Sequence, residues 1–99
     1  MAINEVFHAL GDPTRREILR LLRRRDMSAG ELAEKFPLAK STLSGHFNVL
    51  RQAGLIVSEK HGTVIRYSLN VSAVEEAVEM VMSALHVGAR KKDTKEKAS

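Results

Sequence analysis

The chain has 99 residues, the size of a single domain, and a net charge of +4 that by itself points only weakly to a polyanionic partner. It contains no cysteine, which excludes disulfides, iron–sulfur clusters and thiolate metal sites. Residues 1–10 lack the features of a signal peptide, and no apolar run approaches the roughly 18 residues of a membrane span, so we expect a cytoplasmic protein with no membrane partner.

Two helices are expected in the first quarter of the chain. Residues 3–10 form a short apolar stretch at helical spacing that ends at Gly11. Asp12 then suits the N-cap of a second helix, and Pro13 suits its first helical position. Apolar residues between Ile18 and Leu22 give this second helix a buried side.

Residues 28–54 predict two further helices joined by a short turn. The first begins with a capping box, Ser28 with Glu31, and is expected to run to Phe36 because Pro37 follows. The second is expected from about Ala39 to Gly54, with Leu43, Phe47 and Leu50 facing inward. Helices joined by so short a turn cross steeply, which leaves the second free to enter the major groove of DNA.

A β-hairpin is expected after the helix pair. Residues 56–60 and 63–69 predict two strands around a tight turn at His61-Gly62. The period of two places Ile65, Tyr67 and Leu69 on the inward face.

The last predicted helix, capped by Asn70 or Ser72 and ending near Val87, is apolar over a wide arc. Such a helix in a small domain has to cover two surfaces. One is its own core, and the other is most simply a second copy of the chain. Residues 89–99 form a polar, basic tail that we expect to be disordered, which leaves residues 1–88 as the folded domain.

Three segments together resemble the ArsR/SmtB family of bacterial winged-helix repressors: ALGDPTRREILRLL, ELAEKF with STLSGHFNVLRQAGLI, and the hairpin ending IRYSL. Residues 26–31 look most like the SdpR-like branch, which lacks metal ligands. The resemblance covers residues 3–87 and implies a mainly α fold with a small β-hairpin. This fold is a winged helix-turn-helix of about five helices and a two-stranded wing, with a recognition helix and a wing from each subunit of a homodimer on DNA.

The resemblance also places the homodimer interface on the first and last helices. The residues expected there are Ile3, Val6, Phe7, Leu10, Val74, Val78, Val81, Met82 and Leu85. Metal-sensing members of the family use a Cys-x-Cys on the third helix, where residues 31–35 contain no thiol. Others use ligands on the last helix at positions that match Val71, Ala73, Ala84 and Val87. His8 and His86 could meet at the dimer interface, but an unsupported pair is more often packing, so we predict no metal and no cofactor.

Exposed polar residues of the recognition helix and the hairpin tip are the candidate DNA contacts. Lys40 could donate to guanine or to phosphate, Ser44 can donate or accept, and the Thr42 methyl group suits thymine. The full set of candidates is Lys40, Ser41, Thr42, Ser44, Gly45, His46, Asn48, Arg51, Lys60, His61 and Thr63. A solvated helix start and a solvated hairpin are the alternatives, and for His46 half-buried packing is the alternative to a phosphate contact.

Two positions in this set depart from the family pattern. Ser44-Gly45-His46 stands where the family often has Ser-His-His, and Gly62-Thr63 stands where it often has Gly-Arg. Each departure removes a potential DNA contact.

No arrangement of residues suggests catalysis, so we expect a binding protein and not an enzyme. The sequence favours a homodimeric repressor on an imperfect palindromic operator in double-stranded DNA, with its own promoter among the candidates. A protein-interaction module and a sequence-independent architectural DNA binder are the alternatives. Release from DNA is left open between a small-molecule inducer, a protein anti-repressor and dilution.

Overall fold

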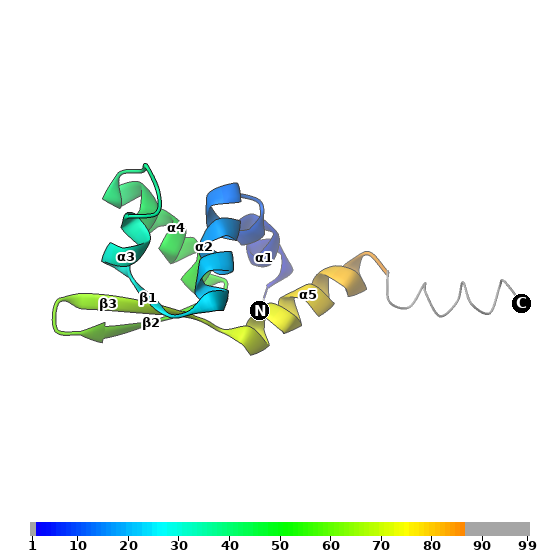
Figure 1. Ribbon diagram of the computed structural model, residues 1–99. Helices are drawn as coiled ribbons and strands as arrows, with labels where there is room; N and C mark the ends of the chain where they lie inside the picture. Colours follow the sequence, from blue (N-terminus) through cyan, green and yellow to red (C-terminus); the bar gives the residue numbers. More distant parts are fainter. Residues whose placement is uncertain (1, 87–99) are drawn as a thin grey trace, which may run out of the picture.

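The computed structural model describes residues 2–86, which form five helices and a three-stranded antiparallel sheet (Figure 1). In chain order the elements are α1 (Ile3–Leu10), α2 (Pro13–Arg24), β1 (Met27–Ser28), α3 (Ala29–Ala33), α4 (Lys40–Gln52), β2 (Ile56–His61), β3 (Val64–Leu69) and α5 (Val71–Ala84). The predicted winged helix-turn-helix, with its mainly α content, is confirmed. Val87, Gly88 and the tail predicted to be disordered lie outside the described residues.

Side-chain caps explain where three of the helices begin. The Asp12 carboxylate accepts a hydrogen bond from the Arg15 backbone N–H at 3.1 Å, and Pro13 occupies the first turn of α2. Ser28 and Glu31 form the predicted capping box of α3, at 3.1 and 2.8 Å. Asn70, and not Ser72, caps α5, because its Oδ1 accepts from the Ala73 N–H at 3.2 Å.

The third helix is shorter than predicted. It ends at Ala33, and residues 34–38 turn without continuing the helix to Phe36. The Lys35 N–H donates to the Leu32 carbonyl at 3.0 Å, a three-residue bond that tightens the chain into a turn. Pro37 disfavours the α conformation at the residue before it, so the chain leaves the helix early.

The sheet contains one strand that the sequence did not predict. β1 pairs with β3 through Met27↔Tyr67 and Ser28↔Arg66, which gives the strand order β1-β3-β2. The hairpin turn is Gly62-Thr63 and not His61-Gly62, because His61 still pairs with Val64. Gly62 has a φ of +63°, which glycine adopts without strain.

The inward face of the hairpin is only partly as predicted. Tyr67 is buried and Leu69 is half-buried, but Ile65 is 38% exposed. Ile65 pairs with Lys60, close to the hairpin tip, so it shares the face of Tyr67 but lies beyond the core.

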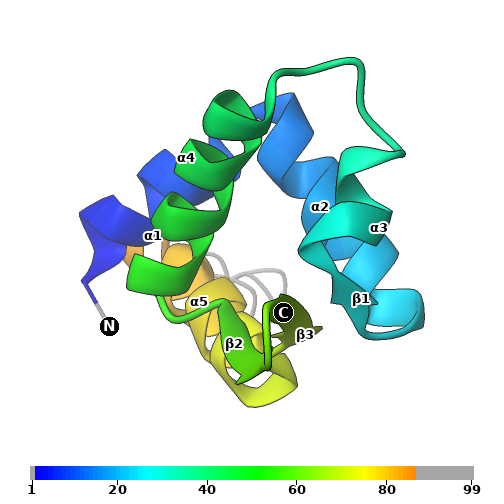
Figure 2. The same ribbon diagram turned by 90° about the vertical axis from the view of Figure 1, so that its left-hand side faces the viewer.

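The core joins α1–α4 to the base of the hairpin. Its largest fully buried side chains are Ile18, Leu32, Leu43, Leu50, Leu55 and Val6. Figure 1 shows α3, α4 and the hairpin on one side of the molecule and α5 projecting on the other. Figure 2 views the first side directly, with α3 and α4 side by side above the hairpin. Among the described helices, none is long and apolar enough to cross a membrane.

Candidate nucleic-acid interface

The N-terminal half of α4 presents polar side chains to solvent while its other face packs in the core. Leu43, Phe47 and Leu50 are buried, as predicted. Lys40, Ser41, Thr42 and Ser44 are exposed. Ala39 precedes the helix and supplies no side-chain cap, so the first backbone N–H groups of α4 are free to meet an anion. Donors, acceptors and a cation are therefore gathered on the end of the helix that meets base edges in this class of fold.

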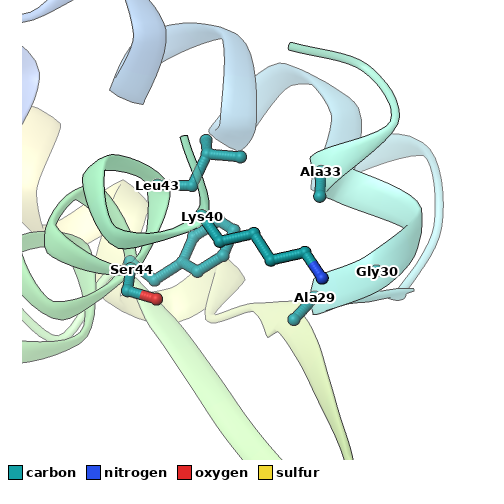
Figure 3. Close-up of a pocket in the computed structure, with 7 residues that line it drawn as sticks. Ala29, Gly30, Ala33, Lys40, Leu43 and Ser44 are labelled. Atoms are coloured by element: carbon teal, nitrogen blue, oxygen red, sulfur yellow. The ribbon is translucent and has the colours of Figure 1, made fainter. Parts of the chain in front are cut away.

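A hollow of about 190 Å³ separates α3 from α4 beside these residues. Its walls are Ala29, Gly30, Ala33, Lys40, Leu43, Ser44 and Phe47. Figure 3 shows the Lys40 side chain extending across the hollow toward Ala29 and Gly30, with Ser44 at its edge. The small side chains of α3 leave this flank of α4 accessible.

Gly45 has no structural reason to be glycine in the free chain. It is exposed in the middle of α4, and a Cβ built there meets no heavy atom within 4 Å. It is also not one of the glycines with positive φ, which are Gly54 and Gly62. Glycine costs about 1 kcal/mol relative to alanine within a helix, and two explanations for its presence stay open: a close approach of the helix backbone to DNA, and neutral drift at an exposed position.

Asn48 and Arg51 are linked to each other on the exposed side of α4. An Arg51 guanidinium nitrogen donates to Asn48 Oδ1 at 3.0 Å. Reading adenine requires an asparagine to use both its carbonyl oxygen and its amide nitrogen. Asn48 would therefore have to release Arg51 first, and Arg51 would then be free for phosphate.

His46 takes the packing position that the sequence left open. Its ring is half-buried, with Nδ1 at 3.1 Å from an Arg15 guanidinium nitrogen and 3.8 Å from Asp12 Oδ2. Partial desolvation tends to raise the pKa of Asp12, but the hydrogen bond from the Arg15 N–H and the positive charges nearby, that of Arg15 among them, outweigh it and hold that pKa below its usual value. The geometry favours packing over a direct phosphate contact for His46.

Lys60, His61 and Thr63 are all exposed at the hairpin tip. Lys60 shares the face of Tyr67, whereas His61 points to the opposite face and pairs with Glu59, Nε2 to Oε1 at 2.8 Å. The acid beside His61 reduces the attraction of that face for phosphate, so Lys60 is the stronger candidate for a phosphate contact.

The predicted dimer residues fall into three groups. Val6 is fully buried in the chain's own core, so it has no surface to offer a partner and is removed from the interface. Ile3, Leu10, Val74 and Val81 are half-buried. Phe7, Val78, Met82 and Leu85 are 41–63% exposed, on α1 and α5, which pack against each other. The residues of the last two groups remain candidates for an interface with a second copy of the chain.

Arg15 adjoins the candidate site through His46, a link that sequence reasoning missed. Its side chain is only 9% exposed and hydrogen-bonds the carbonyls of His8 and Ala9 as well as His46. The signal was its place in the Asp12-Pro13-Thr14-Arg15 motif, which marked the family without giving the arginine a role.

The residues present do not fit a metal site. The chain has no cysteine, and within residues 2–86 no three His, Asp or Glu side chains come together around one point. The positions on the last helix that match the family's ligands hold only valine and alanine, and in residues 31–35 Glu31 is engaged as the cap of α3.

Known proteins are similar to this chain in sequence and in structure. The family model described as "Bacterial regulatory protein, arsR family" matches residues 12–58. The chain is 41% identical over 86 residues to the transcriptional repressor SdpR of Bacillus subtilis, covering 87% of this chain and 96% of that protein. It is 39% identical over 85 residues to the HTH-type transcriptional regulator KmtR of Mycobacterium tuberculosis, covering 85% and 65%. An ArsR-like transcriptional regulator from Rhodococcus sp. RHA1 has a similar structure, with a TM-score of 0.75 and 31% identity over 98% of this chain and 92% of that one.

Proposed function

Because this chain belongs to the ArsR family of bacterial regulatory proteins and is a DNA-binding transcriptional repressor, we propose that it binds a palindromic operator as a homodimer. Each subunit places the N-terminal half of α4 in the major groove and the hairpin tip on the flanking backbone. Two recognition helices then occupy successive major grooves about 34 Å apart. Binding there blocks transcription from the overlapping promoter.

One observation carries the proposal: α4 is held in the core by a row of buried side chains, while the polar residues at its N-terminal end are exposed. Leu43, Phe47 and Leu50 fix the helix, and Lys40 and Ser44 are exposed beside the hollow between α3 and α4. An α-helix presented in this way fits the major groove, which is about 12 Å wide. The charge distribution supports this orientation, since α5 at the far side carries only acidic charges.

The relatives are transcriptional regulators, which argues against an enzyme and against the interaction-module alternative. An inducer or protein anti-repressor would release DNA by changing the spacing or orientation of the two recognition helices. It would have to separate the two subunits or rotate α4 so that it no longer fits the major groove.

The test compares two alanine variants on two duplexes. An operator is first selected from random duplex DNA, and a scrambled duplex of equal length serves as the nonspecific reference. Ser44→Ala should lose about 1–3 kcal/mol of discrimination between the two duplexes, because it removes a base contact. Lys60→Ala should weaken binding to both duplexes alike and lower the salt slope by about one, because it removes a phosphate contact.

Ser72→Ala is the matched control, since Ser72 is exposed on α5 and should leave both affinities unchanged. Equal losses on operator and scrambled DNA for Ser44→Ala would remove its base-reading role. A native protein with no preference for any duplex in the pool would refute the proposed function.

A further inference from the structure

The buried guanidinium of Arg15 closes the C-terminal end of α1. Its Nε donates to the Ala9 carbonyl at 2.9 Å, and one terminal nitrogen donates to the His8 carbonyl at 2.7 Å. Carbonyls in the last turn of a helix run out of intrahelical partners, so these bonds satisfy groups that need them. The positive charge also complements the negative end of the helix dipole. Arg15, from the first turn of α2, thereby fixes where α1 ends.

The remaining guanidinium nitrogen of Arg15 reaches α4. It lies 3.1 Å from Nδ1 of His46, a residue 31 positions further along the chain. A guanidinium has only donors, so Nδ1 has to accept, and the ring has to be neutral with its proton on Nε2. A protonated imidazole would present a second N–H, and a like charge, to the guanidinium. The link between α1 and α4 therefore exists in only one protonation state of His46.

Two charged groups face the His46 ring, and both come from the start of α2. Arg15 opposes protonation, whereas Asp12, with Oδ2 at 3.8 Å from Nδ1, favours it. From α1, the side chains of Glu5 and His8 line a separate hollow of about 110 Å³ against the C-terminal half of α4. A ring that gains a proton would lose the bond to Arg15 and be drawn to Asp12.

We propose that Arg15 and His46 are positioning residues for DNA binding, which hold α4 on the end of α1 and release it when His46 takes up a proton. The inference rests on the proposed function, in which α4 enters the groove and α1 contributes to the dimer interface. His46 lies two residues after Ser44, so a small rotation of α4 moves the base-reading side chains directly. The outcome is a specific affinity that falls on acidification.

The sign of this pH dependence separates positioning from direct contact. If His46 touched a phosphate, protonation would add a positive charge to the interface, and affinity would rise as the pH fell. Loss of the hydrogen bond between Arg15 and His46, which we call the clasp, predicts that affinity falls as the pH falls. The fall in affinity should be confined to operator DNA, because binding to scrambled DNA does not depend on where α4 places its side chains.

The experiment measures dissociation constants on operator and scrambled duplexes at pH 8 and pH 6 at fixed ionic strength. His46→Asn supplies an oxygen that can accept from Arg15 and does not titrate, so its operator affinity should stay within about threefold of the native value at pH 8. On going to pH 6 the native protein should lose about tenfold in operator affinity relative to this variant, the typical effect of one lost hydrogen bond to a charged group. His86→Asn, the same change just after α5 and outside the candidate DNA contacts, should keep the native pH response on the operator.

Two results would overturn the proposal: an operator affinity that rises at pH 6 in the native protein but not in His46→Asn, or identical pH responses of the two. Nitrogen NMR of the native protein with labelled histidine gives a readout that does not depend on the variant folding. It should show Nδ1 of His46 unprotonated at pH 8, and a proton there would refute the clasp. Absence of sequence preference at pH 8 would instead refute the proposed function, while the spectrum still reports on the clasp.

Discussion

Ser44 and His46, two residues apart on α4, show how burial divides functions along one helix. Positions two apart in an α-helix point about 200° apart around its axis. Ser44 is exposed at the edge of the hollow, whereas His46 is half-buried against Arg15. The proposed roles follow from this difference: Ser44 meets a base edge directly, and His46 acts through the placement of the helix.

Gly45 lies between them, and its replacement separates stability from binding. Gly45→Ala should stabilise the folded protein by about 0.5–1 kcal/mol, because glycine is a poor helix former and the new methyl group meets no neighbouring atom. The same methyl group should weaken operator binding several-fold, because it holds the helix away from the base edges. Thermal unfolding and operator titration measure the two effects.

Ser72→Ala provides the comparison for this prediction, since it raises helix propensity on α5, away from the proposed DNA surface. It should leave operator affinity unchanged. An unaltered operator affinity in Gly45→Ala would show that the groove leaves room for a side chain there, and that the glycine is a neutral feature of this helix.

At the scale of elements, α3 depends on its first turn. It has only five residues, too few to be stable through its own backbone hydrogen bonds. Its capping box and the burial of Leu32 hold it against the core. The Ser28 N–H bond to the Glu31 carboxylate, followed by the contact with Arg25, lowers the pKa of Glu31 below its usual value.

Glu31→Gln should therefore reduce stability in a pH-dependent way. Because the folded-state pKa lies below the unfolded one, ionised Glu31 stabilises the protein above the unfolded pKa, near 4.5, and this contribution is lost as the pH falls through the folded value. The gap in urea midpoint between native protein and Glu31→Gln should be largest near pH 7 and shrink below pH 4. Glu34→Gln, at the other end of α3, should show no such convergence. A gap of constant size would mean that the charge of Glu31 has no part in capping.

Local signals explain which elements the sequence could predict. The starts of α2, α3 and α5 follow from side chains that cap the adjacent backbone, so they are readable within four residues. β1 is two residues long and exists only because β3 pairs with it, so no local pattern marks it. The exposure of Ile65 depends on how far the core extends under the hairpin, which alternation along one strand does not reveal.

In the candidate site, too, the features that depend on nearby residues could be predicted, and those that depend on distant segments could not. The exposed polar residues at the start of α4 were predicted from their place at the N-terminal end of the recognition helix. Helical spacing alone would not have given this result, because Lys40 lies three and seven residues before Leu43 and Phe47 and therefore on their side of the helix. The packing of His46 was left open, because it is decided by Arg15 on another helix. The burial of Val6 likewise depends on the neighbours of α1, and periodicity alone did not separate it from the exposed Phe7.

At the scale of the molecule, the surface proposed to face DNA and the surface proposed for self-association lie at opposite ends. The recognition helix and hairpin occupy one side, and α5 projects from the other (Figures 1 and 2). Apolar side chains are exposed on both α5 and α1, and these two helices pack against each other. Pairing through this surface would cover the apolar side chains and leave both recognition helices facing outward.

Val78→Asp tests this arrangement, because Val78 is 50% exposed on α5 and its replacement would bury a charge in the proposed interface without disturbing the core. The variant should sediment as a folded monomer. Its operator affinity should fall at least about a hundredfold, since two linked half-sites bind far more tightly than one. Val57→Asp is the matched control, with the same change at a residue of the same 50% exposure on β2, and it should remain dimeric. If Val78→Asp still forms dimers, the subunits pair through another surface, and the spacing of the recognition helices would have to be derived from that surface instead.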